Sequence, residues 1–174
     1  MEIRYMKQTD DKYAISHIYE ESWKFAYKDI IPQSYLESIP AGRWIPNLNN
    51  KEMDTLVLIE DGNFIGTSSY CKSRFPEFSN WGEIVSIYFL PQYIGKGYGK
   101  KLLNAVIEEL ASLGFQDIFL WVLEENLRAR QFYEKAGFRF SGNSLNDNIG
   151  GKDLRELQYC CSIRNWRNEH GGTI

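Results

Sequence analysis

The sequence predicts one α+β domain, and three observations support this prediction. The chain has 174 residues, about the length of a single domain. Strand-like and helix-like hydrophobic patterns alternate along it, and one pair of strand patterns has the spacing of a hairpin. No internal repeat or low-complexity linker divides the chain. We therefore expect one hydrophobic core, which a composition of 43% hydrophobic residues is ample to fill.

The first third of the chain predicts one short strand and two helices. Residues 2–6 alternate like a strand, and residues 9–11 are three side chains that can cap a following helix. Apolar residues then recur at helical spacing over residues 14–26. A second short helix is expected over residues 32–39, where a proline occupies the first turn, and residues 42–50 are expected to form a loop.

A β-hairpin is expected next in the chain. Residues 55–59 and 64–70 read as two strands, separated by a tight turn that contains Asp61 and Gly62. An Asp-Gly pair tolerates the positive φ angles that a two-residue hairpin turn requires. The pattern therefore predicts two adjacent antiparallel strands.

The centre of the chain predicts a strand, a glycine-rich loop and a helix, in that order. Residues 83–90 are rich in β-formers, and Pro91 ends the run because proline cannot donate to a strand ladder. Three alternate glycines follow within residues 95–99. Apolar residues at helical spacing over 102–113 then predict an amphipathic helix, with Gly114 placed to end it.

The last third predicts three strands and one helix. Residues 115–123 are an apolar run suited to a buried strand, and residues 126–137 read as a helix with an Asn cap and a Gly stop. Two more strands are expected at residues 138–141 and 154–161. The Asn- and Gly-rich residues 143–151 are expected to separate them.

Composition argues against several classes of function. Twenty Lys and Arg against 23 Asp and Glu give a net charge of −3, so we expect neither a nucleic-acid partner nor an anionic membrane partner. The three cysteines (Cys71, Cys160 and Cys161) do not form a disulfide framework, and the two histidines lie in no ligand spacing, so no metal is expected. No secretory pattern opens the chain, and no apolar run is long enough to span a bilayer, so a cytoplasmic location is expected.

The glycine loop is the sharpest chemical signal in the sequence. Gly95, Gly97 and Gly99 carry no side chains that would keep an anion from the backbone N–H groups before a helix, and Lys96 and Lys100 add positive charge. Such a loop can bind a pyrophosphate. The alternative is a flexible connection with solvated lysines. The loop matches neither the Walker pattern nor the dinucleotide fingerprint.

Two segments resemble the GCN5-related N-acetyltransferase (GNAT) family. Residues 87–103 resemble its strand, (Q/R)xxGx(G/A) loop and long helix, and residues 126–138 are similar to its NxxAxxFYxxxGF pattern. Residues 22–32 and 150–152 resemble one branch of small bacterial members. The likeness covers about residues 2–159. One departure is Ile94, which stands where the family has Arg or Gln when the loop is aligned on the helix that follows.

The resemblance implies a fold and a domain boundary. It implies the acyl-CoA N-acyltransferase fold of this family, with a central mixed, mostly antiparallel sheet flanked by helices. The acetyltransferase domain is expected over residues 1–162, followed by a C-terminal tail at 163–174.

The resemblance also implies acetyl-CoA as the acetyl donor, with no metal. The pyrophosphate is expected on the backbone of the glycine loop, and the pantetheine arm is expected to pair with the preceding strand like an added strand. Asn126 would reach the arm, although a plain helix cap is the alternative. The residues implied to bind the cofactor are Ile87, Tyr88, Phe89, Gly95, Lys96, Gly97, Tyr98, Gly99, Lys100 and Asn126.

Two catalytic residues and two acceptor-binding residues are candidates. By family position, the Tyr133 hydroxyl would stabilise the departing thiolate; a core tyrosine with a satisfied hydroxyl is the alternative. Glu83 is the best-placed carboxylate to act as a base toward the amine, directly or through water; an exposed glutamate at a strand end is the alternative. Trp23 and Tyr27 are candidate walls of the acceptor pocket, although aromatic residues at helical spacing also suit a core.

The expected activity is direct transfer of acetyl from acetyl-CoA to a primary amine of a small molecule. A protein or peptide acetyltransferase acting on an N-terminus or a lysine is an alternative, as is a non-catalytic acyl-CoA sensor. An acyl-enzyme on Cys71 is disfavoured because neither histidine is near it in the chain. A homodimer stays open, and no motif identifies the acceptor.

Overall fold

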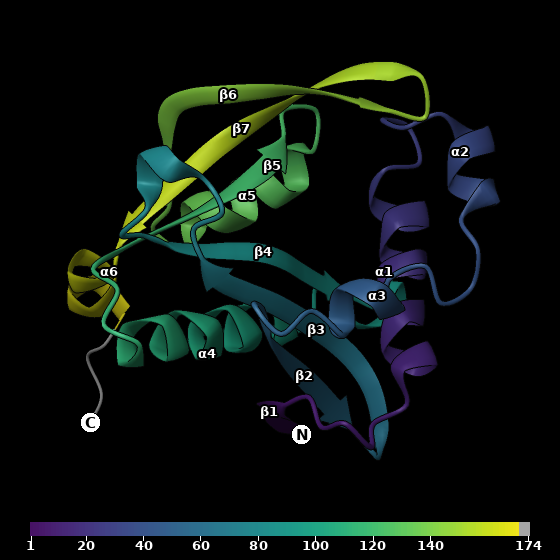
Figure 1. Cartoon of the computed structure of the whole chain (residues 1–174), viewed down its shortest axis with the longest axis horizontal. Coiled ribbons are helices and arrows are strands. Elements are labelled where there is room, and N and C mark those ends of the chain that lie inside the picture. The colour runs from purple at the N-terminus through teal and green to yellow at the C-terminus, as the bar shows by residue number, and fades with distance from the viewer. Residues whose placement is uncertain (171–174) are drawn as a thin grey trace.

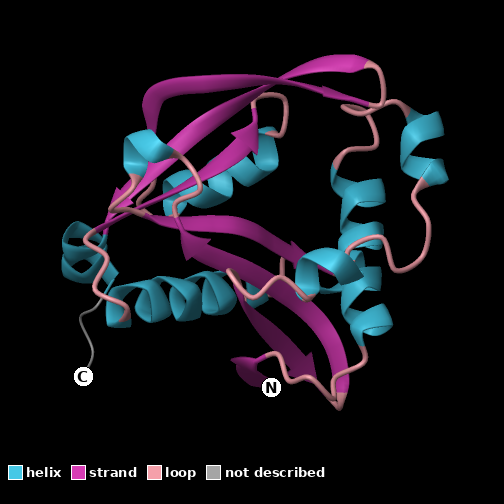
Figure 2. Cartoon of the chain, viewed as in Figure 1, coloured by secondary structure: helices cyan, strands magenta, loops and turns pink. Residues whose placement is uncertain are grey.

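The computed structural model describes residues 1–170, which form a seven-stranded mixed sheet with surrounding helices (Figures 1 and 2). The strand order is β1-β2-β3-β4-β5-β7-β6. The strands are β1 (Glu2–Tyr5), β2 (Asp54–Glu60), β3 (Asn63–Lys72), β4 (Gly82–Phe89), β5 (Asp117–Leu123), β6 (Arg139–Ile149) and β7 (Lys152–Ser162). The α-helices are α1 (Lys12–Ala26), α2 (Gln33–Ser38), α3 (Ile45–Leu48), α4 (Tyr98–Ser112), α5 (Leu127–Lys135) and α6 (Ile163–His170). Two 3₁₀ turns are η1 (Pro76–Phe78) and η2 (Pro91–Tyr93).

The predicted hairpin is confirmed in the antiparallel half of the sheet. Strands β2 and β3 pair antiparallel, and the turn between them has Asp61 at φ 49° and Gly62 at φ 77°. Both residues therefore lie in the left-handed region that a tight hairpin turn uses. Strand β1 adds to β2 and β4 adds to β3, both antiparallel.

Strands β4 and β5 form the one parallel pair in the described sheet, and they soon separate. They pair at only two positions, Gly82 with Ile118 and Glu83 with Phe119. Beyond Glu83, β4 has no strand partner on its β5 side, whereas β5 continues alongside β7. The sheet is therefore mixed and mostly antiparallel, as expected, and it opens into a V between its fourth and fifth strands.

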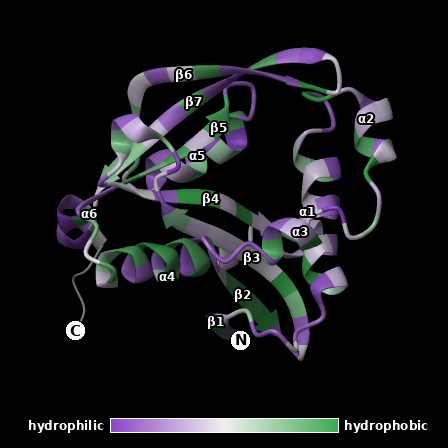
Figure 3. Cartoon of the chain, in the orientation of Figure 1, coloured by the Kyte–Doolittle hydropathy of each residue, from purple (hydrophilic) through white to green (hydrophobic). Residues whose placement is uncertain are grey.

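Helices cover both faces of the sheet because strand residues alternate in direction. Leu56 and Leu58 of β2 belong to the main core cluster with α4, whereas Val57 between them packs in a second cluster with Ile15 and Tyr19 of α1. Figure 3 shows the corresponding apolar stripe along α4. The fully buried residues of that stripe are Leu102, Leu103, Val106, Ile107 and Leu110. None of the described helices is long and apolar enough to cross a membrane.

The second hairpin is longer than the sequence predicts. Residues 143–151 were expected to separate two short strands, but β6 and β7 each have 11 residues and meet at a turn of Gly150 and Gly151. Both glycines have positive φ, at 62° and 84°, which suits a two-residue turn. Polar residues continue along β6 because it is an exposed edge strand, so its sequence carries no alternation of apolar residues.

Two short helices stand where no helix was expected. The predicted loop at 42–50 contains α3, whose Leu48 is buried against the α1 cluster. Within the expected tail at 163–174, residues 163–170 form α6, and its Ile163 and Trp166 are buried in the main core cluster. Residues 171–174 lie outside the described residues.

Candidate active site

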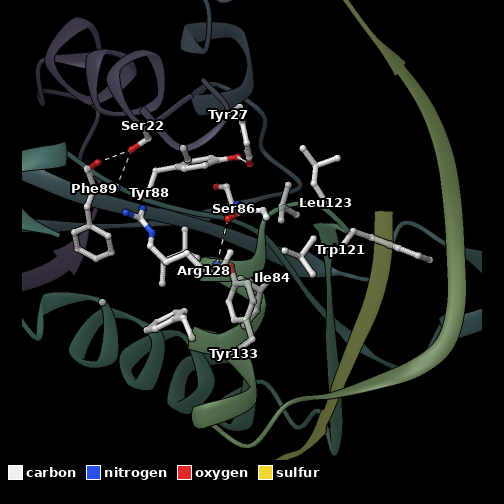
Figure 4. A pocket seen from close by; sticks show the side chains of 18 of the residues that line it. Ser22, Tyr27, Ile84, Ser86, Tyr88, Phe89, Trp121, Leu123, Arg128 and Tyr133 are labelled. Carbon is white, nitrogen blue, oxygen red and sulfur yellow. Dashed lines mark hydrogen bonds between the residues drawn. The ribbon is translucent and has the colours of Figure 1, made fainter. Parts of the chain in front are cut away.

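A cavity of about 710 Å³ occupies the V between β4 and β5 (Figure 4). Its walls come from α1, β4, the loop before α4, β5, α5 and the β6–β7 hairpin. Within residues 1–170 no group of three or more His, Cys, Asp or Glu is placed to hold a metal ion.

A β-bulge in β4 changes which of its side chains face α4 and which face α1. The pairing of β4 with β3 shifts by one residue at Val85, which has no partner on β3. Ile84 and Ile87 are therefore both packed in the α4 cluster although they are three residues apart. Ser86 faces α1 instead, with its hydroxyl 3.1 Å from that of Tyr19.

The glycine loop opens onto the cavity with its main chain. Gly95 and Gly97 have φ angles of 81° and 84°, and a Cβ added to either would meet no atom within 4 Å. Gly97 is the N-cap of α4, so the first N–H groups of that helix point toward this open space. Lys100 also lines the cavity. The loop thus offers unobstructed N–H donors beside a positive charge, which suits an anion.

Two of the predicted loop side chains point elsewhere. The Tyr98 hydroxyl donates a hydrogen bond to Glu60 at 3.1 Å, and the Lys96 ammonium lies 5.3 Å from the centroid of the Tyr93 ring. Neither Lys96 nor Tyr98 lines the cavity. Their prediction as binding residues therefore applies to their main-chain groups alone.

The open edge of β4 is already bonded at one point. The N–H of Phe89 donates to Ser22 Oγ at 3.1 Å, and the Ser22 hydroxyl donates to the carbonyl oxygen of Phe89 (Figure 4). Tyr88 points to the α1 face, where its hydroxyl lies 3.3 Å from that of Tyr27. Ile87 also lines the cavity. A ligand that pairs with this edge at Phe89 must therefore displace Ser22 or share its bonds.

Asn126 has the cap role that the sequence predicts and also lines the cavity. Its side-chain oxygen accepts a hydrogen bond from the N–H of Ala129 at 3.2 Å, which caps α5. The side-chain NH₂ group has no hydrogen bond to another described residue. The cap role therefore leaves two donors available to a ligand.

Tyr133 projects from α5 into the cavity (Figure 4). Its ring packs against Phe132 and Phe138, and the residue is 8% exposed. The hydroxyl has no hydrogen bond to another described residue, so the alternative of a core tyrosine with a satisfied hydroxyl does not hold. Burial, and to a smaller extent the charge of Tyr88, raises the pKa of Tyr133 above its usual range.

Glu83 is buried and held by Arg74. Glu83 is 1% exposed, so the alternative of an exposed glutamate is wrong. Arg74 donates from Nη2 to one carboxylate oxygen at 2.6 Å and from Nε to the other at 3.1 Å. The N–H of Arg74 adds a third bond at 3.0 Å. This bidentate pair raises the pKa of Arg74, mainly through its hydrogen bonds to Glu83.

Trp23 and Tyr27 line the cavity from α1 and also belong to a core cluster. Their rings lie 5.1 Å apart, edge to face, beside buried Leu36 and Leu154. Burial raises the pKa of Tyr27 to about 12. The two interpretations of these aromatics are therefore compatible, because both residues line the cavity and also pack against the core cluster.

The comparison with known proteins decides the family. A model described as the acetyltransferase (GNAT) family matches residues 13–138, which is most of the chain. The chain belongs to the GNAT acetyltransferase family.

Curated relatives of this GNAT protein are named acetyltransferases. An uncharacterized N-acetyltransferase, YuaI of Bacillus subtilis, is 29% identical over 64% of this chain and 66% of its own length. A spermine/spermidine N(1)-acetyltransferase of the same organism is 35% identical over 49% of this chain and 59% of its own length. The two matches thus span 66% and 59% of the lengths of these relatives, less than two thirds of each. A spermidine N(1)-acetyltransferase of Thermoplasma acidophilum is 26% identical over 86% of this chain and 92% of its own length.

Solved structures agree on the fold. A Streptococcus mutans protein, smu.2055, superposes with a TM-score of 0.72 at 20% identity, over 94% of this chain and 99% of its own. A PaiA N-acetyltransferase from Thermoplasma acidophilum, solved in complex with coenzyme A, gives 0.69 at 23% identity, over 93% and 99%. The expected GNAT fold is confirmed.

Arg74, Phe75, Trp121 and Glu156 are among the residues of this GNAT cavity that the sequence missed. Arg74 and Phe75 come from the segment after β3, Trp121 from β5 and Glu156 from β7. The Phe75 ring lies 5.5 Å from that of Trp121. These four residues come from three separate segments of the sequence and lie outside the family patterns, so only the tertiary structure brings them together. The signal that was available is weak: Glu156 is a charged residue inside a predicted strand.

Proposed function

We propose that this protein transfers the acetyl group of acetyl-CoA directly to a primary amine of a small molecule. The observation that carries the proposal is a single cavity that joins an anion-binding loop, the open edge of β4 and the Tyr133 hydroxyl. The loop would bind the pyrophosphate of acetyl-CoA, the β4 edge would position the acetyl end, and Tyr133 would stabilise the departing thiolate, all within one cavity. Acetyl-CoA supplies an acetyl thioester. Membership of the GNAT acetyltransferase family supports acetyl transfer as the activity.

The residues present fit acetyl-CoA. The space beside Gly95 and Gly97 is open, so the backbone N–H groups of this loop would receive the pyrophosphate there, with Lys100 beside them; at Gly99 an added Cβ would lie 3.3 Å from the Phe132 ring. The pantetheine amides would pair with the β4 edge at Ile87 and Phe89, taking the place of the Ser22 bonds. The side-chain NH₂ of Asn126 would donate to the same arm from α5.

Tyr133 is suited to stabilise negative charge on the departing sulfur. A thiol has a pKa near 8.5 and an ordinary phenol one near 10, so complete proton transfer from phenol to thiolate is already unfavourable by about 2 kcal/mol. The burial that raises the pKa of Tyr133 makes this transfer still less favourable. Tyr133 therefore donates a hydrogen bond that strengthens as charge develops.

The β6–β7 hairpin favours a small acceptor over an extended peptide. Lys152 donates from Nζ to the carbonyl oxygen of Ile30 at 2.8 Å, and a Cβ at Gly150 would lie 2.6 Å from that of Tyr35. The hairpin tip therefore contacts both α2 and the segment between α1 and α2, and Ile149 lines the cavity. A long peptide would have to cross this closure. The acceptors in the names of two relatives are polyamines, which are small amines.

The proposal is tested by thiol release from acetyl-CoA with a panel of monoamines, polyamines, aminoglycosides, amino acids and peptides. We expect release with at least one small amine and a rise in melting temperature with acetyl-CoA that NAD and ATP do not produce. Release with peptides alone would favour a protein acetyltransferase. Strong donor binding without release by any amine would favour a sensor and contradict the proposed activity.

A further inference from the structure

We propose that Glu156 binds the ammonium group of the acceptor and accepts its proton, and that the acceptor is a monoamine with an apolar or aromatic body. This inference rests on the proposed function, because it concerns the acceptor half of the same cavity. By the acceptor half we mean the part lined by Trp23, Tyr27, Phe75, Trp121 and Glu156. It names a residue that neither the family pattern nor the composition points to.

The carboxylate predicted as the base is already engaged. Glu83 accepts three hydrogen bonds from Arg74, two of them from the guanidinium, and is 1% exposed. Its negative charge is thus compensated within the protein. An amine that used Glu83 would have to compete with a bidentate, charge-assisted pair, which is among the stronger side-chain interactions.

Glu156 is available in the way that Glu83 is not. It lies on β7 opposite Leu123 of β5, and it lines the same cavity. Among the described residues it has no hydrogen bond and no ion pair. Burial is the main reason that its pKa is raised, and the nearby carboxylate of Asp147 raises it further, whereas Arg74 lowers it. A half-buried carboxylate without a partner is destabilised when charged, so a cation in the cavity would stabilise it.

The charged groups around Glu156 define its surroundings. Asp147 on β6 and Arg74 beside β4 act on Glu156, and the charge of Glu156 in turn raises the pKa of Tyr27 on α1 and of Arg74. Arg74 is hydrogen-bonded to Glu83 and acts on Glu156 only through its charge, which is the smallest of the three effects on the pKa of Glu156. The acceptor half of the cavity therefore keeps one carboxylate without a hydrogen-bonded or ion-paired partner among the described residues.

Charge divides the cavity into two halves. Its remaining cations, Lys100, Arg128 and Lys135, come from α4 and α5, where an anionic donor would lie. Its only carboxylates within the described chain are Glu83 and Glu156. One free negative charge fits one ammonium group. Asp147 lies near Glu156 but does not line the cavity, so the two further charges of a molecule such as spermidine meet no second unpaired carboxylate in the described cavity lining.

Aromatic rings surround the acceptor half. Trp23 and Tyr27 border it from α1, and Phe75 and Trp121 border it on the β5 side. Such rings bind apolar bodies, and their faces also attract a cation. The pocket therefore suits an amine whose body is apolar or aromatic.

The proton and bond changes balance with Glu156 as proton acceptor. The ammonium N–H transfers its proton to a carboxylate oxygen of Glu156, which leaves a neutral amine with a free electron pair. That pair forms the N–C bond to the acetyl carbonyl carbon, and the C–S bond breaks with its electrons on sulfur. The nitrogen loses its second proton, which the thiolate takes up, and Glu156 releases the first proton to water. The products are an amide, CoA thiol and one proton.

The decisive experiment measures amine binding rather than turnover. CoA-loaded protein is titrated by calorimetry at pH 7.5 with 2-phenylethylamine and with the uncharged analogue 2-phenylethanol, in wild type, Glu156→Gln, Glu83→Gln and the control Glu125→Gln. Glu125 is an exposed carboxylate at the end of β5 whose partner is Lys152. We expect Glu156→Gln to weaken the amine by about tenfold or more and to leave the alcohol unchanged. The control should bind both like wild type.

Several results would overturn the inference. One is an amine dissociation constant that is unchanged in Glu156→Gln, and another is amine binding that is weakened, with alcohol binding unchanged, in Glu83→Gln but not in Glu156→Gln. The inference is also overturned if wild type does not bind the amine, or if it binds spermidine more than about tenfold more tightly than 2-phenylethylamine. Glu156→Gln should also melt no lower than wild type near neutral pH, because it removes a carboxylate whose raised pKa makes its charged form costly to the fold. A melting profile lower at all pH values would show a structural role instead.

Thiol release with the same amine separates this inference from the proposed function. If Glu156 takes the proton, Glu156→Gln should lower kcat/KM by about 10²–10⁴-fold near pH 7, and the deficit should shrink as pH rises toward the pKa of the amine. A deficit constant with pH would contradict the proton role. Amine binding that depends on Glu156, with no release by any variant or amine, would contradict the proposed transfer and leave the ammonium site supported.

Discussion

The two halves of the cavity are built in different ways. The proposed donor half is formed mainly by the main chain of residues 95–100 and of the β4 edge, with the side chains of Lys100 and Asn126 beside it, whereas those of Lys96 and Tyr98 point elsewhere. The acceptor half is formed by side chains from α1, β5, β7 and the segment after β3. A main-chain site depends on local conformation, whereas a side-chain site depends on the register of distant strands. The donor half should therefore be common to related chains of different specificity, and the acceptor half should set which amine is used.

Tyr133→Phe tests the junction of the two halves and should have a larger effect on activity than Arg74→Met, Gly97→Val or Ile94→Arg. We expect kcat to fall by about 10–1000-fold with little change in acetyl-CoA affinity, because the lost hydrogen bond strengthens only as charge develops on sulfur. Steady-state rates with both substrates saturating, together with a donor titration, measure this. Phe132→Leu on the same helix is a control for packing. Wild-type turnover in Tyr133→Phe, with chemistry rate-limiting, would contradict the leaving-group role.

Arg74→Met tests whether the acceptor half is held together by its ion pair. It leaves Glu83 buried without a partner, which should lower the free energy of unfolding by about 3 kcal/mol. Denaturant unfolding at neutral pH measures the loss, and Arg155→Met removes an exposed pair with Glu124 as a control that should cost under about 1 kcal/mol. Equal losses in the two variants would mean that the Arg74 pair adds nothing beyond a surface contact.

Gly97→Val tests the donor half. The valine side chain would enter the space above the loop and require a φ of 84° that branched residues rarely adopt, so acetyl-CoA affinity should fall by about 10–100-fold. Gly114→Val, at a helix end with φ 91° and open space around it, carries a similar backbone cost away from the cavity. Donor titration and thermal melting separate affinity from stability. If both variants bind acetyl-CoA like wild type, the loop is not the anion site.

Ile94→Arg should give the smallest effect and is a second test of the donor half. Ile94 lines the cavity at the end of η2, where the family has Arg or Gln. An arginine there should tighten CoA by about two- to fivefold through a charge-assisted contact, and the gain should shrink at high salt. Ile94→Met is the uncharged control. No gain at low ionic strength would show that the side chain points away or that the loop is aligned differently with the family.

Local chemistry in the sequence was enough to predict much of this protein. Asp61-Gly62 predicted the hairpin turn because positive φ angles favour those residues, and Asn126 predicted the start of α5 because its side chain caps the helix. Gly95 and Gly97 likewise predicted an unobstructed main chain before α4, where both have positive φ; the anion site itself stays a prediction. These features depend on neighbours within a few residues, so a linear pattern is sufficient to show them.

Only the tertiary structure decided the acceptor half. The bulge at Val85 changes which side chains of β4 face α1 and which face α4, and the β5–β7 register places Glu156 on the cavity wall. Neither feature can be predicted from the neighbouring residues in the sequence. Arg74 meets Glu83 because the segment after β3 returns over β4, which turns a candidate base into half of a buried ion pair. The charge left on Glu156 is a result of that pairing. Side chains that meet through strand register and long-range packing leave no pattern in the order of the chain.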